Sequence, residues 1–360
     1  MVLRKHYQAG LDVGSTTVKI VITDANDRLV YSRYRRHLSD VRTTVISLVD
    51  EAYAEFPEAE ITIAAAGSGG IAVAEWLQIP FVQEVVACTE SIGRYIPQTD
   101  VAIELGGEDA KITFFDQGVD QRMNETCAGG TGAFIDQMAA LLQTDAAGLN
   151  ELALQHSTLY PIAARCGVFA KTDVQPLLNE GAAKTDIAAS ILQAVVDQTV
   201  GGLACGRSIR GRVAFLGGPL FFLSALRQRF SESLKLKEDE VVFPENSQYF
   251  VALGAALLSK EHEVCRFVEV REKALALRNV AVEREIASLT PLFAEEEDKT
   301  DFFRRHGRSK VARRELASFA GDCFLGIDVG STTTKAALLD EGGQLLFSWY
   351  GSNEGNPLAT

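Results

Sequence analysis

The sequence contains no apolar run long enough to span a bilayer, and no apolar stretch follows its basic amino terminus, MVLRKHYQAG. Its formal net charge is −13, which argues against nucleic acid or an anionic membrane as the main partner. We therefore expect a cytoplasmic protein that binds neither nucleic acid nor a membrane. Charged residues make up 23% and hydrophobic residues 47% of the chain, which is typical of globular proteins, and 360 residues can form more than one domain.

Cysteine is scarce, and none of the six cysteines forms a C-x-x-C pair. This excludes an obvious zinc finger or ferredoxin-type motif within the chain, and disulfides are not expected in a reducing compartment. A free cysteine is most often a small buried hydrophobe. We expect that role for four of them: Cys88, Cys205, Cys265 and Cys323. The remaining two, Cys127 and Cys166, stand in motifs described below.

The chain also lacks a Walker A loop and a Rossmann fingerprint. Instead, AGLDVGSTTVKIVITD alternates around a Gly-Ser-Thr turn, which predicts a strand, a tight turn and a second strand. Backbone N–H groups and the hydroxyls of Ser15, Thr16 and Thr17 would surround a phosphate, with Lys19 supplying positive charge. Taken alone, an ordinary hairpin explains the same residues.

Two further glycine turns make a nucleotide site the better interpretation. TDVAIELGGEDAKITFFDQG again predicts a hairpin, and an acidic residue ends the first strand of each, Asp12 in one and Glu104 in the other. Two such hairpins facing each other would enclose a triphosphate, with both carboxylates holding Mg²⁺ through water. The third turn, in GRVAFLGGPLFFL, joins a strand to a helix, and Gly217 and Gly218 would let adenine lie against the backbone.

One internal repeat indicates duplication of a structural unit. LDVGSTTVKIVITDANDRLVYSRY from Leu11 returns without a gap as IDVGSTTTKAALLDEGGQLLFSWY from Ile327. We expect a complete unit over residues 1–258, a charged, helical and solvated linker over 259–322, and the beginning of a second unit over 323–360. The chain would then be a fragment of a longer polypeptide.

The two hairpins and the late Gly-Gly loop resemble the superfamily of sugar and acetate kinases, actin and the large heat-shock chaperones. This resemblance implies an α/β, two-lobed, actin-like (ribonuclease H-like) ATPase fold with a central nucleotide cleft. Lobe I would comprise about 1–98 with a closing helix at about 246–258, and lobe II about 99–245. Asp12 and Glu104 would be catalytic. The implied ATP-binding residues are Gly14, Ser15, Thr16, Thr17, Lys19, Gly106, Gly107, Glu108, Asp109, Gly217, Gly218 and Gln248.

NETCAGGTGAF, followed by ARCGVFAKTDVQPLLNEG, resembles one branch of this superfamily: the iron–sulfur ATPases that activate 2-hydroxyacyl-CoA dehydratases and benzoyl-CoA reductases. The resemblance implies that Cys127 and Cys166 ligate a 4Fe-4S cluster shared between two units, either in a homodimer or within one longer chain. A helix starting after Cys127 would stabilise a thiolate. The implied activity is transfer of one electron, driven by ATP hydrolysis, from reduced flavodoxin or ferredoxin to the dehydratase or reductase.

Two departures keep other interpretations open. The family usually has Asp-x-Gly-Gly-Gln-Asp in its second hairpin, whereas this chain has ELGGED, in which Glu108 adds negative charge beside the phosphates. The duplication is the other departure. A small-molecule kinase of the same fold, acting on a sugar or carboxylate, is one alternative, and it would be free of iron. A degenerate nucleotide-binding scaffold is another, and it would bind ATP without hydrolysing it.

Overall fold

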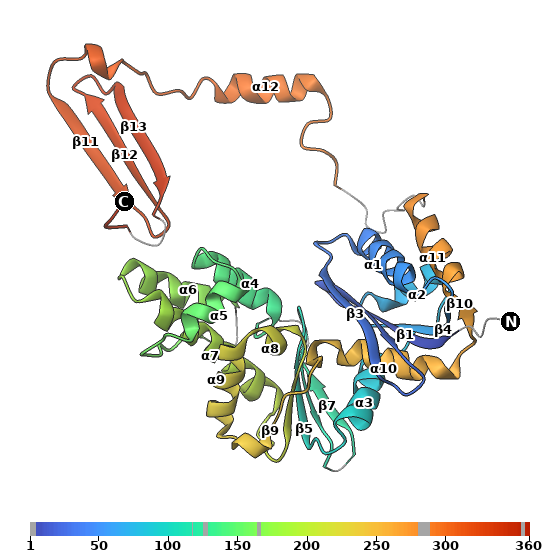
Figure 1. Cartoon of the computed structure of the whole chain (residues 1–360). Coiled ribbons are helices and arrows are strands. Elements are labelled where there is room, and N and C mark those ends of the chain that lie inside the picture. The colour runs from blue at the N-terminus through green and yellow to red at the C-terminus, as the bar shows by residue number, and fades with distance from the viewer. Residues whose placement is uncertain (1–4, 117, 125–128, 164–166, 280–288, 354–356) are drawn as a thin grey trace. The chain divides into compact units, whose positions relative to one another are not determined.

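The structure is a computed structural model that describes residues 5–116, 118–124, 129–163, 167–279, 289–353 and 357–360. The chain divides into two compact units (Figure 1). The main unit comprises Met1–Val174 and Ala183–Val280, and the small unit comprises Gln175–Ala182 and Ala281–Thr360. Within these described ranges, the main unit contains two five-stranded sheets and the small unit one three-stranded sheet.

The first lobe of the main unit is built on a sheet with the strand order β10-β4-β1-β2-β3. β1 pairs antiparallel with β2 and parallel with β4, so a hairpin leads into a parallel crossover through α1. The elements of this lobe are β1 (His6–Val13), β2 (Thr17–Thr23), β3 (Leu29–Arg36), α1 (Val41–Glu55), β4 (Glu60–Ala66), α2 (Gly70–Leu77), β10 (Cys265–Arg266) and α11 (Phe267–Ala276).

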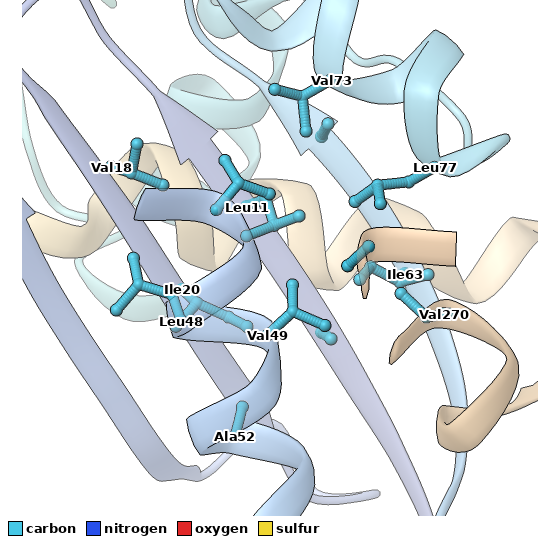
Figure 2. Close-up of a cluster of buried hydrophobic side chains, with 14 of the residues drawn as sticks. Leu11, Val18, Ile20, Leu48, Val49, Ala52, Ile63, Val73, Leu77 and Val270 are labelled. Carbon is cyan, nitrogen blue, oxygen red and sulfur yellow. The ribbon is translucent and has the colours of Figure 1, made fainter. Parts of the chain in front are cut away.

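Helices α1, α2 and α11 cover one face of this sheet, as Figure 2 shows. Leu11 and Ile20 from the strands meet Leu48 from α1 and Val270 from α11 in one buried cluster. Strand side chains alternate between faces, so the other face of β1 is free to pack elsewhere. Gly10 on that face lies against the Ala252 backbone of helix α10 (Phe250–Leu258), so β1 and β4 are covered on both sides, which explains why these two strands are so apolar.

The end of this lobe differs from the sequence-based expectation. The predicted solvated linker began at Ser259, but Phe267, Val270 and Ala274 on α11 are buried in the first-lobe core. Their spacing of three and four residues puts them on one face of a helix, so the charged residues between them face outward while this stripe packs inward. The unit therefore continues about twenty residues beyond the predicted boundary at Leu258, to Val280.

The second lobe contains a sheet with the order β7-β6-β5-β8-β9, in which β5 pairs antiparallel with β6 and parallel with β8. Its strands are β5 (Val101–Leu105), β6 (Ala110–Phe114), β7 (Asp120–Met123), β8 (Val213–Leu216) and β9 (Val241–Val242). Its helices are α4 (Gly132–Leu141), α5 (Ala146–Ala153), α7 (Lys184–Leu203), α8 (Gly218–Phe222) and α9 (Ser224–Leu234), while α6 (Gly167–Asn179) extends across the boundary between units.

Helices α3 (Glu84–Tyr95) and α10 (Phe250–Leu258) join the two lobes, because their buried residues share one cluster with Val21 of the first sheet and Leu216 of the second. Their packing is tight. A Cβ at Gly254 would lie 1.7 Å from the Ala87 carbonyl oxygen. The small residues of α10 thus allow this close approach. Short 3₁₀ helices occupy Glu238–Glu240, Ser247–Tyr249, Ser259–Glu261, Leu277–Asn279 and Leu316–Ser318.

The small unit contains α12 (Glu296–His306) and a meander of β11 (Cys323–Val329), β12 (Thr333–Asp340) and β13 (Leu345–Ser352). The meander repeats the β1–β2–β3 geometry. Asp328 is directly opposite Lys335, as Asp12 is opposite Lys19. The irregularity in register also recurs, between Leu338 and Leu339 here and between Ile22 and Thr23 in the first copy.

Burial distinguishes the two copies. Leu11 and Val13 are fully buried in the main unit, whereas their counterparts Ile327 and Val329 are 62% and 59% exposed. Within the part of the small unit that the structure describes, β11 pairs only with β12, and no strand takes the place that β4 has beside β1. β11 therefore has the apolar side chains of a core strand, like β1, but in the described residues these side chains are exposed.

The cysteine expectations are partly wrong. Cys88 is buried as predicted, and Cys265 is half-buried, but Cys205 and Cys323 are exposed. Cys205 follows the end of α7 in a left-handed conformation with φ of 47°, in a turn at the surface. Cys323 starts β11, all of whose residues are exposed. Cys127 and Cys166, the predicted cluster ligands, lie outside the described residues.

Candidate nucleotide site

A cavity of about 700 Å³ lies in the main unit, where the loops of the two lobes meet. All three predicted glycine turns line it, although they are far apart in the sequence. The predicted residues found in its wall are Asp12, Gly14, Ser15, Thr16, Thr17, Lys19, Glu104, Gly106, Gly107, Asp109, Gly217, Gly218 and Gln248. Glu108 is the exception: its side chain is exposed and does not line the cavity.

The first hairpin turn is closed by the Gly14 N–H, which donates to the Thr17 carbonyl at 2.9 Å. Asp12 and Lys19 are paired across β1 and β2, and Lys19 Nζ lies 2.6 Å from Asp12 Oδ2. Burial by itself lowers the pKa of Lys19, but the nearby Asp12, Tyr34 and Glu104 more than offset this and raise it above its ordinary value. Lys19 therefore remains a largely buried cation at the cavity wall.

The second hairpin has the same construction. The Gly106 N–H donates to the Asp109 carbonyl at 2.7 Å, and Glu104 is opposite Lys111 in the ladder. Here the lysine is shared, because its Nζ lies 2.5 Å from Glu84 Oε1 and 4.0 Å from Glu104 Oε1. Burial, then the Glu104 charge, raises the pKa of the Glu84 carboxyl to about 7, although Lys111 opposes the shift.

The two hairpins approach each other at Gly107. A Cβ there would lie 2.2 Å from Thr16 Oγ1 and 2.9 Å from Ser15 Oγ. Only glycine fits at this position while the hydroxyls of the first turn remain in place. The cavity wall thus brings backbone and hydroxyl groups from both lobes together, which is the kind of surface that surrounds phosphate oxygens.

The third turn forms the other end of the cavity. Gly217 has a φ of 89°, and a Cβ there would lie 2.1 Å from the Leu105 carbonyl oxygen. Phe222 and Tyr34 contact edge-to-face with ring centroids 5.4 Å apart. Among the described residues, Ser247 Oγ and Gln248 Oε1 are buried without a hydrogen-bond partner, and both residues line the cavity. Buried polar atoms of this kind are unusual unless a ligand satisfies them.

Sequence reasoning missed several residues of the cavity wall. Tyr34, Arg36, Glu84 and Asp136 all line it, but none stands in a glycine turn. Glu84 is in the first turn of α3, and Tyr34 and Arg36 are near the end of the third strand. The recurrence of Tyr34 as Tyr350 in the repeat was the one signal that the sequence offered. In the structure both tyrosines have the same neighbour, a lysine whose Nζ lies 5.6 Å from the ring centroid of Tyr34 and 5.8 Å from that of Tyr350.

The first cysteine motif is connected to the second hairpin by its helix. α4 begins five residues after Cys127, and its Gly132 and Ala133 N–H groups donate to the Gly106 and Gly107 carbonyls at 3.0 and 2.7 Å. These are helix-terminal donors that have no partner within their own helix. The cysteine of the second motif likewise precedes a helix, since α6 begins at Gly167, one residue after Cys166. In the described part of the chain, no group of three or more His, Cys, Asp or Glu side chains could hold a metal ion.

Two facing hairpins beneath a Gly-Gly loop, on two α/β lobes joined by α3 and α10, define the actin-like ATPase fold expected from the sequence. The chain belongs to the BadF/BadG/BcrA/BcrD ATPase family, which it matches over residues 9–259. The predicted fold class, family and ATPase assignment are thereby confirmed.

Two similar proteins are named as dehydratase activators. The chain is 28% identical over 279 residues to a 2-hydroxyisocaproyl-CoA dehydratase activator of Clostridioides difficile, a match that covers 76% of this chain and 100% of the relative. It is 33% identical over 187 residues to an activator of lactoyl-CoA dehydratase of Anaerotignum propionicum, covering 50% of this chain and 69% of that one. The relatives are thus activators of 2-hydroxyacyl-CoA dehydratases.

Two solved structures have the same fold. Component A of the (R)-2-hydroxyglutaryl-CoA dehydratase of Acidaminococcus fermentans superposes with a TM-score of 0.62 at 27% identity, covering 71% of this chain and 98% of that one. The activator of the 2-hydroxyisocaproyl-CoA dehydratase of Clostridium difficile, solved with bound ADPNP, gives 0.63 at 25% identity, covering 77% and 100%. No helix in the described ranges is long and apolar enough to cross a membrane.

Proposed function

We propose that this protein is an ATP-hydrolysing activator that passes a low-potential electron to a 2-hydroxyacyl-CoA dehydratase or a related CoA-ester reductase. The names of the relatives support the partner class. The observation that carries the proposal is the pair of hydrogen bonds from Gly132 and Ala133 to the second hairpin. Through them, a phosphate-type loop directly contacts the helix that follows a cysteine motif, so a change at one can move the other.

In the nucleotide site, Asp12 and Glu104 would hold Mg²⁺ through water, and Lys19 would neutralise phosphate charge. The two hairpin turns would surround the phosphates: Gly14, Ser15, Thr16 and Thr17 from one lobe, and Gly106, Gly107 and Asp109 from the other. Gly217, Gly218 and Gln248 would surround adenosine, where the unpartnered Gln248 amide oxygen can accept a hydrogen bond from the adenine amino group. Glu108 would act only as an exposed negative charge near the site.

Cys127 and Cys166 would hold a 4Fe-4S cluster shared with a second unit. The neighbouring residues fit this role, because α4 and α6 begin five and one residues after these cysteines and helix amino termini stabilise thiolates. The cluster, when bound, takes up one electron at a time and releases it. Reduced flavodoxin or ferredoxin would be the donor, in the cytoplasm.

The repeat supports a further part of the proposal: residues 323–360 begin a second activase-like unit after a charged linker. Its first hairpin has the same cross-strand ion pair, with Lys335 Nζ 3.0 Å from Asp328 Oδ2. It also has the same turn bond, from the Gly330 N–H to the Thr333 carbonyl at 2.9 Å. A second unit of this kind is one candidate for the partner that shares the cluster, and a second copy of the chain is the other.

Anaerobic iron and sulfide analysis tests this function most directly. Cys127→Ser and Cys166→Ser should each remove iron while leaving ATP binding largely intact, and should weaken the association of two units that a shared cluster holds together. Cys205→Ala is a stringent control, because its thiol is exposed and therefore accessible to adventitious iron. Iron that persists in Cys127→Ser but falls in Cys205→Ala would overturn the assignment. A colourless, iron-free protein that phosphorylates a small molecule would support the kinase alternative.

A further inference from the structure

An ion pair in the wall of the nucleotide cavity joins one lobe to the other. Arg36, at the end of β3, contacts Asp136 on α4 through both guanidinium nitrogens, with Nη1 2.6 Å from Oδ2 and Nη2 3.1 Å from Oδ1. Both residues line the cavity. A fork-to-fork pair of this geometry restricts the orientation of its partners as well as their separation.

Each end of this pair is attached to a different phosphate-type hairpin. On one side, Arg36 is the direct cross-strand partner of Thr17, and the following N–H, of His37, donates to the Thr16 carbonyl at 3.2 Å. On the other side, Asp136 belongs to the first two turns of α4, whose Gly132 N–H donates to the Gly106 carbonyl. Helix α4 is therefore connected to the second hairpin by its backbone and to the first hairpin by Asp136.

We propose that Arg36 and Asp136 are positioning residues that make α4 follow the separation of the two phosphate hairpins. When phosphate groups draw the hairpins together, the pair holds α4 against β3; when the lobes separate, the pair breaks and α4 remains attached to the second hairpin alone. The two arrangements differ in one bidentate contact. A nucleotide that binds better to the arrangement with this contact therefore shifts the population toward it. Because α4 follows Cys127 in the sequence, this inference extends the proposed function by naming the contact that relates ATP to the cysteine motif.

Hydrogen exchange of the α4 amides in the full chain, with and without saturating ADPNP, tests the pair. In the wild-type protein ADPNP should slow exchange over Gly132–Leu141. In Arg36→Ala that protection should fall about two- to fivefold, the range expected for loss of a partly exposed ion pair. The double charge exchange Arg36→Asp with Asp136→Arg should restore it, whereas Arg36→Asp alone should not.

The adjacent residue provides a matched control. Arg35 makes an equally bidentate contact with Glu51, at 2.9 and 3.1 Å, but that pair joins β3 to α1 within the first lobe. Arg35→Ala should leave the ADPNP-dependent protection of α4 unchanged. Equal effects of Arg35→Ala and Arg36→Ala, or full protection in Arg36→Ala at saturating ADPNP, would overturn the inference. The readout requires neither iron nor a partner enzyme, so it succeeds or fails independently of the iron analysis.

Discussion

Lys111 makes its short contact with Glu84 and not with Glu104, the residue directly opposite it in the ladder. In the first hairpin the corresponding lysine, Lys19, pairs with its own cross-strand partner, Asp12. The two acidic strand ends that face the cavity therefore differ: Asp12 is paired with a lysine, while Glu104 is 4.0 Å from the nearest one. Glu84 thus takes the closer contact with the lysine that faces Glu104 across the ladder.

The first prediction concerns the pH dependence caused by Glu84. The ordinary pKa of a Glu carboxyl is 4.5, and that of Glu84 in the folded protein is raised to about 7. Its contribution to stability is therefore present below pH 4.5 and is lost as the pH rises through 7. Relative to Glu84→Gln, the wild-type free energy of unfolding should fall by at most about 3 to 4 kcal/mol over this range, since one pKa unit corresponds to about 1.4 kcal/mol. Urea unfolding of both proteins at several pH values measures the difference. A difference that stays constant with pH would contradict the raised pKa.

A second prediction concerns Gly107. In Gly107→Ala the new methyl group would lie 2.2 Å from Thr16 Oγ1 and 2.9 Å from Ser15 Oγ, so the first-turn side chains or the two hairpins must shift. Overpacking of this kind costs about 1–3 kcal/mol, and we expect ATP to bind about tenfold or more weakly. Calorimetric titration with ADPNP measures this, and circular dichroism of the same sample checks that the variant is folded. Unchanged affinity in a folded Gly107→Ala protein would show that the contact between the two turns does not govern nucleotide binding.

A third prediction separates the two ends of the cavity. Gln248→Leu keeps the size of the side chain but removes the buried, unpartnered amide oxygen. If this oxygen accepts a hydrogen bond from adenine, ATP should bind about two- to tenfold more weakly, in proportion to the roughly 0.5–1.5 kcal/mol of one hydrogen bond. Inorganic triphosphate, which lacks the base, should bind equally well to both proteins. An equal loss for both ligands would place Gln248 near the phosphates instead.

A fourth prediction compares two glycines on the helices between the lobes. In Gly254→Ala the methyl group would lie 1.7 Å from the Ala87 carbonyl oxygen, so α10 and α3 must move apart, and we expect a loss of about 1–3 kcal/mol or more in unfolding free energy. Gly93→Ala on α3 adds its methyl group to open space and should gain about 0.5–1 kcal/mol, because alanine is the better helix former. Urea denaturation of the two variants should therefore give changes of opposite sign.

The hairpins and the Gly-Gly loop were predictable because their signals are local. Alternating apolar residues and glycine turns determine a hairpin within about twenty residues, and the repeat showed one of them twice. Glu84, Arg36 and Asp136 were not predictable, because their roles arise only when α3, β3 and α4 meet around one cavity. The same limit applies to α11: its buried stripe is short and lies within a strongly charged segment, so composition alone indicated a solvated linker.

The duplicated hairpin has a consequence for how the chain folds. Because Asp12 and Lys19 have counterparts in Asp328 and Lys335 at identical register, β1 could pair with β12 and satisfy the same ladder. Such a hybrid would have to close a loop of several hundred residues in place of a tight turn, at an extra entropic cost of about 4 kcal/mol. Proximity along the chain therefore favours the correct pairing in addition to packing, since β12 has Ala336 and Ala337 where β2 buries Ile20 and Val21. During synthesis the first hairpin has the further advantage of emerging before its competitor exists.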